Sequence, residues 1–405
     1  MSLTVRHLNG DTTFLLTFAP TAERPPSPPG PGSYQPPGTF TVLVDPWLAG
    51  PNVLWHPKFL LSRHTTPLYV KSLSQLPEPN IVLISQAKPD HCHEATLRQL
   101  DPTSPITTIL AEPAAAKKIL GMKHFHPSMV HSLRNYSEKK PDSVIRFFIP
   151  PVVPGGAPGE ATISFIPAKI DVSGVHNAIG ITYRPPSSTS IPSRPFSPSS
   201  SSYRQNGFPR PAHAPTTALP ITPPDSPIQQ TSSSPSNLAY SNSSRSAADS
   251  HPSNSSSNHN PSVSSLSSTS TASRPQAEKA LSLIYSPHGV NYSLIRAYAS
   301  SHLVQTAALP LTLLLHSFDR VNNPWWMGGN VAAGLPGGVE IAQNLMARCW
   351  ISAHDEDKDN SGLAVMNVKT RKYTKEEVRE MLWAQKGGNI HVANLGVGEE
   401  MMLKA

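Results

Sequence analysis

A carboxylate, two imidazoles and a thiol lie next to one another in the segment 81–97, IVLISQAKPDHCHEATL. Asp90, His91 and His93 carry groups that hold divalent metal ions or transfer protons during catalysis. A plainer role for Asp90 is the N-cap of the helix that follows, with His91 hydrogen-bonded beside it. Cys92 is interpreted as a small buried residue, and His93 as a structural residue that is also a candidate additional ligand.

Residues of the same chemical type end several other predicted strands. They are Asp45, His288, His316 and His354, in addition to Asp90 and His91. Ligands of α/β proteins bind at the carboxyl ends of strands, where side chains from separate strands come together. We therefore expect these residues to converge on one site, with Asp45 holding a loop in place.

The hydrophobic pattern predicts the elements that position these side chains. Ile81–Ile84 is a short β-branched run typical of a strand buried on both faces, and 94–100 is predicted to begin a helix. Asn9-Gly10 between two apolar runs predicts a hairpin. Further strands are predicted over 40–44, 106–110, 144–148, 161–166, 180–184, 280–285, 311–315 and 349–353, and further helices over 113–120, 292–300, 339–348 and 374–383.

Composition divides the chain into parts. Strands and helices alternate over 1–183 and resume over 279–390, and both stretches are predicted to form one domain. Residues 184–278 are rich in Ser, Pro, Asn and Thr, and such a segment buries too little apolar surface to offset the entropy of ordering. This insertion is therefore predicted to be disordered, and its Ser-Pro and Thr-Pro pairs make it a candidate for phosphorylation and for binding a protein partner. Residues 391–405 are expected to be a tail.

The charge and cysteine content limit the function and the compartment. The formal charge is +7 over 405 residues and no run of Lys or Arg concentrates it, so nucleic-acid binding is not expected. Two cysteines, Cys92 and Cys349, are too few for a disulfide framework and are typical of a reducing compartment. The chain lacks the pattern of a signal peptide or a membrane span, so we expect a cytoplasmic or nuclear protein that does not bind membranes.

Four segments carry a resemblance to a known family: VLVDPWL at 42–48, LISQAKPDHCHEATL at 83–97, LIYSPHG at 283–289 and GGVEIAQNLMARCWISAH at 337–354. With the opening strands, they resemble the metallo-β-lactamase fold superfamily, and most of all its ascorbate-phosphate-lactonase-like branch. The resemblance covers 1–183 and 279–370. It implies an α/β (α+β) fold, a four-layer αββα sandwich that the long disordered insertion interrupts here.

The superfamily's H-x-H-x-D-H motif falls at Gln86, Lys88, Asp90 and His91, so only the last two positions match. In the superfamily the Asp-His pair and a late histidine hold one metal ion, and the resemblance implies Asp90, His91 and His354 for these ligands. The first two motif histidines help to hold a second ion. Here a glutamine and a lysine replace them, and a lysine ammonium disfavours a nearby divalent ion, so this second site is expected to be empty.

Two further positions depart from the family pattern. His288 takes the position of a bridging aspartate and is expected to be a fourth ligand or a proton shuttle. The mid-chain histidine has no clear counterpart, and Lys169 and His176 are its nearest candidates. Lys88 would lie near the second site, where its ammonium could attract an anionic group of the substrate.

Two hypotheses from different functional classes follow. The first is a metal-dependent hydrolase that activates water with a single divalent ion, Zn²⁺ by ligand preference with Mn²⁺ or Fe²⁺ as alternatives, and acts on a small-molecule substrate. Its catalytic residues would be Asp90 and His288. The alternative is a pseudoenzyme that binds no metal and keeps the fold as a binding or scaffold module.

Overall fold

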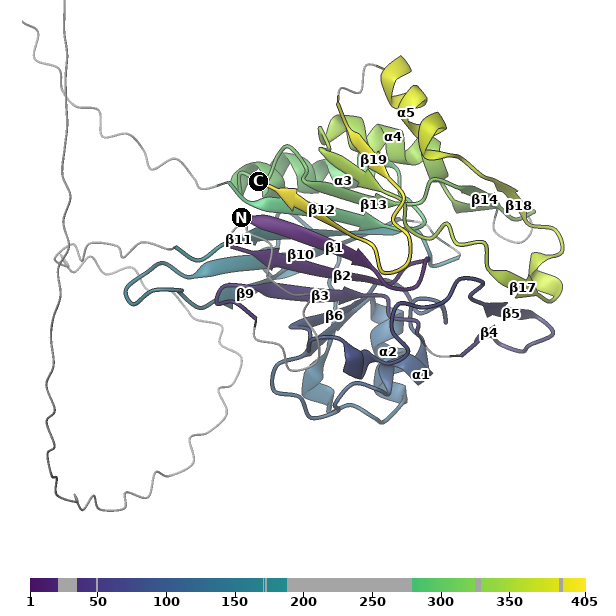
Figure 1. The fold of residues 1–405 in the computed structure, drawn as a ribbon, viewed down its shortest axis with the longest axis horizontal. Helices are drawn as coiled ribbons and strands as arrows, with labels where there is room; N and C mark the ends of the chain where they lie inside the picture. The colour runs from purple at the N-terminus through teal and green to yellow at the C-terminus, as the bar shows by residue number, and fades with distance from the viewer. Residues whose placement is uncertain are drawn as a thin grey trace, which may run out of the picture. The chain divides into compact units, whose positions relative to one another are not determined.

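The computed structural model describes residues 1–20, 35–48, 50–169, 171, 173–187, 279–324, 329–385 and 389–405. Two seven-stranded sheets make up most of this part of the chain (Figure 1). In spatial order the first sheet contains β20 (Glu400–Lys404), β1 (Ser2–His7), β2 (Phe14–Ala19), β3 (Phe40–Val44), β6 (Ile81–Ile84), β7 (Thr108–Ala111) and β8 (Val130–Ser132). Neighbours from β20 to β3 are antiparallel, and those from β3 to β8 are parallel.

The second sheet has the same mixed character. In spatial order it contains β19 (His391–Ala393), β16 (Cys349–Ile351), β13 (Leu313–His316), β12 (Leu281–Ser286), β11 (Asn177–Arg184), β10 (Gly159–Pro167) and β9 (Val144–Ile149). The strands from β19 to β12 are parallel to one another, and those from β12 to β9 are antiparallel. The parallel halves of both sheets supply the strand ends that carry the predicted site residues.

The main core lies between the two sheets and is built from alternate residues of their strands. Val42 and Val44 of β3 and Leu283 of β12 belong to this core. Leu43 and Ile284, which alternate with them, pack instead against helices on the outer faces. The helices are α1 (Glu94–Leu97) and α2 (Pro113–Gly121) on the first sheet, and α3 (Tyr292–Tyr298), α4 (Gly334–Asn344) and α5 (Lys375–Ala384) on the second. The predicted four-layer αββα sandwich is therefore confirmed.

The remaining strands form two small sheets. One contains β15 (Asn330–Ala332), β14 (Arg320–Asn322) and β18 (Lys369–Arg371), and the other contains β17 (Asp359–Ser361), β5 (Leu60–Arg63) and β4 (Asn52–Leu54).

Among the residues that the structure describes, no helix has the length and apolarity that a membrane crossing requires.

Two differences from the predictions concern the start of α4 and the end of the chain. α4 begins at Gly334 and not at Val339. The prediction placed Gly338 before the helix, but this glycine lies inside it, where the Trp350 ring packs against it. A Cβ at Gly338 would lie 2.1 Å from that ring, so the glycine serves close packing and does not mark a helix start. Residues 391–405, expected to be a tail, supply β19 and β20 to the edges of the two sheets. β20 pairs with β1, so both chain ends lie in one sheet (Figure 1).

We predict that the connection between β11 and β12 can be replaced by a short turn without loss of stability. Tyr183 and Leu281 are direct partners across this antiparallel pair, so a few residues can join the two strands. Replacing 188–278 with a turn that contains Asn-Gly is expected to leave the free energy of unfolding unchanged or to raise it by about 2–3 kcal/mol, because a shorter loop costs less entropy to close. Urea unfolding measures the change, and a loss of stability would contradict the prediction.

The predicted disorder of the insertion concerns residues that, apart from 184–187, lie outside the described part.

Candidate metal centre

Three histidines from three loops meet at the carboxyl ends of parallel strands. His91 follows β6 of the first sheet, and His288 and His354 follow β12 and β16 of the second. One ring nitrogen of each lies within 4.8 Å of those of the other two. The ring centroids of His288 and His354 are 4.4 Å apart, and that of His91 is 5.3 Å from the first and 5.1 Å from the second. The imidazole cluster therefore contains residues from both sheets of the sandwich.

Asp45, at the end of β3, fixes the orientation of His91. Its Oδ2 lies 2.7 Å from His91 Nδ1 and accepts hydrogen bonds from the Ser85 hydroxyl at 2.5 Å and the Tyr285 hydroxyl at 2.6 Å. Its Oδ1 accepts a hydrogen bond from the Ser85 backbone N–H at 2.7 Å. All of these residues are buried. Because a carboxylate only accepts, Nδ1 of His91 carries a proton, and Nε2 is the nitrogen that can bind a further proton or a metal ion. A carboxylate that accepts a hydrogen bond from the other ring nitrogen of a ligating histidine is typical of metal sites.

His288 is oriented in the same sense. Its Nδ1 lies 3.0 Å from the carbonyl oxygen of Val331, so this nitrogen is the donor and Nε2 keeps a lone pair. The two Nε2 atoms of His91 and His288 lie 3.2 Å apart. Two lone pairs at this distance repel unless a cation, a proton or a metal ion, lies between them. Two nitrogens bound to one tetrahedral zinc ion at 2.0–2.1 Å lie about 3.3 Å apart, so the observed spacing fits zinc ligation.

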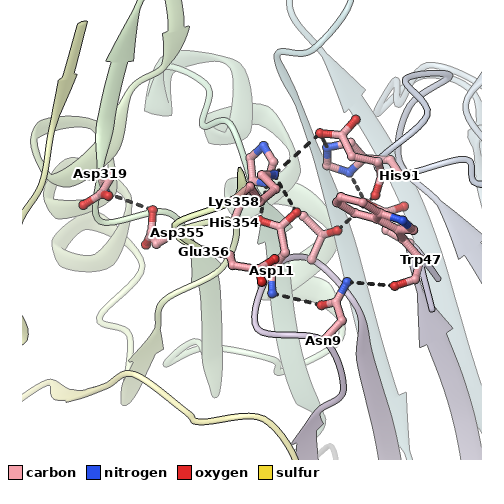
Figure 2. Close-up of polar contacts among 12 residues, drawn as sticks. Asn9, Asp11, Trp47, His91, Asp319, His354, Asp355, Glu356 and Lys358 are labelled. Carbon is pink, nitrogen blue, oxygen red and sulfur yellow. Dashed lines mark hydrogen bonds and ion pairs between the residues drawn. The ribbon is translucent and has the colours of Figure 1, made fainter. Parts of the chain in front are cut away.

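Asp11, in the turn between β1 and β2, orients His354. Its Oδ1 lies 2.8 Å from His354 Nδ1, and its backbone carbonyl accepts from the His354 N–H at 3.0 Å (Figure 2). Asn9 shapes the turn by accepting the backbone N–H groups of Asp11 and Thr13 through Oδ1. Nδ1 of His354 is thus the donor, and Nε2 is the nitrogen left for a ligand.

Backbone strain accompanies two of these residues. His354 has a φ of 75° and Asp45 a φ of 40°, both in the left-handed region that non-glycine residues seldom adopt. Such conformations cost about 1–3 kcal/mol each and persist where surrounding contacts hold them, often at functional sites. Here the hydrogen bonds to Asp11 and Ser85 supply those contacts.

The electrostatics of the cluster differ from one ring to the next. Burial, reinforced by His354 and His91, holds the pKa of His288 well below its usual value, so this ring is neutral and keeps its lone pair. Burial likewise lowers the pKa of His354 although Asp11 opposes the shift. Burial also lowers the pKa of His91, but the carboxylates of Asp90 and Asp45 outweigh it and raise the pKa overall. His91 is therefore the ring whose Nε2 attracts a cation most strongly.

Asp90 lies beside the histidines and not among them. Its Oδ2 is 3.9 Å from His91 Nε2 and 3.8 Å from the Nζ of Lys358. Burial raises the pKa of Asp90, but the positive charges of His91 and Lys358 outweigh it and lower the pKa, so the group is a carboxylate at neutral pH. Asp90 also forms a second candidate metal-ligating group with Asp11 and His354.

The other candidates from the sequence lie outside both groups. The ring of His93 lies 3.0 Å from Thr96 Oγ1 and 3.4 Å from the Pro51 carbonyl oxygen, and that of His176 lies 3.0 Å from each of the carbonyls of Gly289 and Asn330. His316 lies against Trp350 and holds the carbonyl of Ser317 through Nδ1. Lys88 contributes its backbone carbonyl to the turn that carries His91, and the buried Gln86 has no side-chain hydrogen bond within the described residues.

Two residues of the site were not singled out from the sequence. Asp11 belongs to an Asn-Gly-Asp turn, which predicts a hairpin and hides a second role for the carboxylate. Lys358 lies in a mostly acidic segment, HDEDKD, that is typical of a solvated loop. The signal available for Lys358 was its position four residues after His354, on the loop that leaves β16.

Comparison with known proteins gives matches among solved structures only. No protein-family model matches the chain, and no curated protein matches it significantly. Igni18, described as a novel metallo hydrolase from the hyperthermophilic archaeon Ignicoccus hospitalis, is 11% identical with a TM-score of 0.42, and the match covers 100% of both chains. YhfI from Bacillus subtilis, described as a metallo-β-lactamase fold protein, is 8% identical with a TM-score of 0.39 over 98% of this chain and 99% of its own. The solved structures to which this chain is similar thus include a metallo hydrolase and a metallo-β-lactamase fold protein.

Proposed function

We propose that the protein is a metal-dependent hydrolase whose single divalent ion is held by His91, His288 and His354. The observation that carries the proposal is the 3.2 Å approach of two imidazole Nε2 atoms whose Nδ1 atoms are both committed as donors. Two buried histidines anchored in this way cost stability unless a cation lies between them.

The donor set of three imidazoles supports zinc, with Fe²⁺ as an alternative, whereas Mn²⁺ prefers oxygen ligands. Three protein ligands with a remaining position for water or substrate are typical of catalytic zinc, and imidazole also suits iron. When bound, such an ion supplies Lewis acidity, which lowers the pKa of water towards ~7 and polarises the bond to be hydrolysed. The protein's part is to orient the three rings, through Asp45, Val331 and Asp11.

Asp90 is proposed as the proton acceptor. Its carboxylate is ionised, is about one-fifth exposed and lies 3.9 Å from His91 Nε2, so it borders the position that the three rings enclose. A carboxylate there can take the proton of the attacking water and return it to the leaving group. The substrate is proposed to be a small molecule.

We predict that Asp90→Asn lowers kcat by about 10²–10⁴-fold while the metal content stays unchanged, because the amide keeps the size of the side chain but cannot accept the proton. The measurement is turnover of activated esters, lactones and phosphodiesters by metal-loaded protein, before and after removal of metal by a chelator. His93→Gln is the matched control, since the His93 ring contacts Thr96, Pro51 and Trp47 outside the histidine cluster and its loss should leave turnover intact. Metal-loaded protein that turns over none of these compounds would contradict the hydrolase proposal.

A further inference from the structure

The ammonium of Lys358 lies between two carboxylates next to the three histidines. Its Nζ donates to Asp11 Oδ2 at 2.8 Å and lies 3.8 Å from Asp90 Oδ2 and 3.4 Å from His354 Nδ1. The side chain is only 12% exposed, and the ammonium is 5.8 Å from the centre of the Trp47 ring. The positive charge of Lys358 therefore lies between the carboxylates of Asp11 and Asp90, and Figure 2 shows it beside Asp11 and His354.

The carboxylates around Lys358 also belong to a candidate metal-binding group. Asp11, Asp90 and His354 offer three ligand atoms within 4.8 Å of one another. Two carboxylates suit a hard divalent ion such as Mn²⁺. An ammonium and a divalent ion repel one another strongly at these distances in a buried site, so the two cannot share the same acceptors.

We infer that Lys358 is the resident cation of this second group and that it limits the centre to one divalent ion. The lysine neutralises Asp11 and Asp90 in place of a metal, and it leaves the histidine cluster as the one position for an ion among the described residues. Removing the ammonium frees both carboxylates, which then form a second site. The location of the inferred site rests on the proposed metal centre, but its test is a difference in metal count and not an activity.

The test is a titration with Mn²⁺, in which the free ion is counted by electron paramagnetic resonance. Lys358→Ala is expected to bind one more Mn²⁺ per chain than the wild type, and its melting temperature should rise with Mn²⁺ by more than that of the wild type. Lys358→Arg keeps a cation on the same backbone position and should bind no additional ion. Asp11→Asn added to Lys358→Ala should remove the additional ion, because it takes away one of the two carboxylates.

The outcomes separate this inference from the proposed function. Equal Mn²⁺ counts for Lys358→Ala and the wild type would overturn the inference, whether or not the wild type binds an ion. A wild type that binds none and a variant that binds one would support the inference and contradict the proposed centre. If Lys358→Ala does not fold without metal, Lys358→Gln and refolding in Mn²⁺ replace it, and failure of Mn²⁺ to restore folding to either variant would also overturn the inference.

Discussion

Asp45→Ala is expected to lower the free energy of unfolding by about 3–5 kcal/mol, the usual cost of removing one partner from a buried charged network. Asp45 is fully buried and accepts hydrogen bonds from Ser85, Tyr285 and His91. Alanine leaves all of these donors without the acceptor that they share, and each unsatisfied buried group costs about 1–3 kcal/mol. Urea unfolding of metal-free protein gives the value.

Asp45→Asn separates the structural effect from the effect on the metal. The amide keeps the shape and one acceptor oxygen, so the loss of stability should be smaller than for alanine. The asparagine amide places a donor or a weaker acceptor against His91 Nδ1. The affinity for Zn²⁺ should therefore fall about 10–100-fold, as is usual when a ligating histidine loses the hydrogen-bond partner of its other ring nitrogen. A stability loss under about 1 kcal/mol for Asp45→Ala would mean that the network contributes little.

His288→Ala is expected to reduce the affinity for Zn²⁺ by more than about 100-fold, because it removes one of three ligands and not only a partner behind a ligand. The ring also shares the closest approach to His91, at 3.2 Å between the Nε2 atoms. His316→Asn is the matched control. His316 ends the neighbouring strand β13 and is equally buried, but its Nδ1 holds the Ser317 carbonyl and it lies outside the ligand groups. The control should bind zinc as the wild type does.

The fold could be predicted from the sequence because its strands carry local signals. β6 and β3 are almost uninterrupted apolar runs, and the Asn9-Gly10 turn between β1 and β2 is a short-range hairpin pattern. The small sheets were not predicted, because a strand such as β17 contains no apolar residue and is exposed along its whole length. The edge strands β19 and β20 are short or only half-buried, so burial gives them no strong period either.

The candidate site could be predicted where a residue ends a strand. His91, His288 and His354 were expected at one site for that reason, and the structure brings them together. Asp11 and Lys358 were not expected, because their contacts with His354 and Asp90 depend on how the two sheets pack and have no local signal. His316 ends a strand as well, yet the ring is held against Trp350 by packing that the sequence pattern does not encode.

The metal content of the wild-type protein tests the central claim most directly. Protein purified without chelator, or reconstituted with Zn²⁺ and freed of excess ion, should carry about one equivalent of metal per chain by elemental analysis. Its melting temperature should rise with added Zn²⁺ or Mn²⁺, because an ion that binds only the folded state stabilises it by several kcal/mol at ~1,000 times the dissociation constant. Protein that retains well under a tenth of an equivalent and gains no thermal stability from either ion would contradict the account and favour a metal-free binding module.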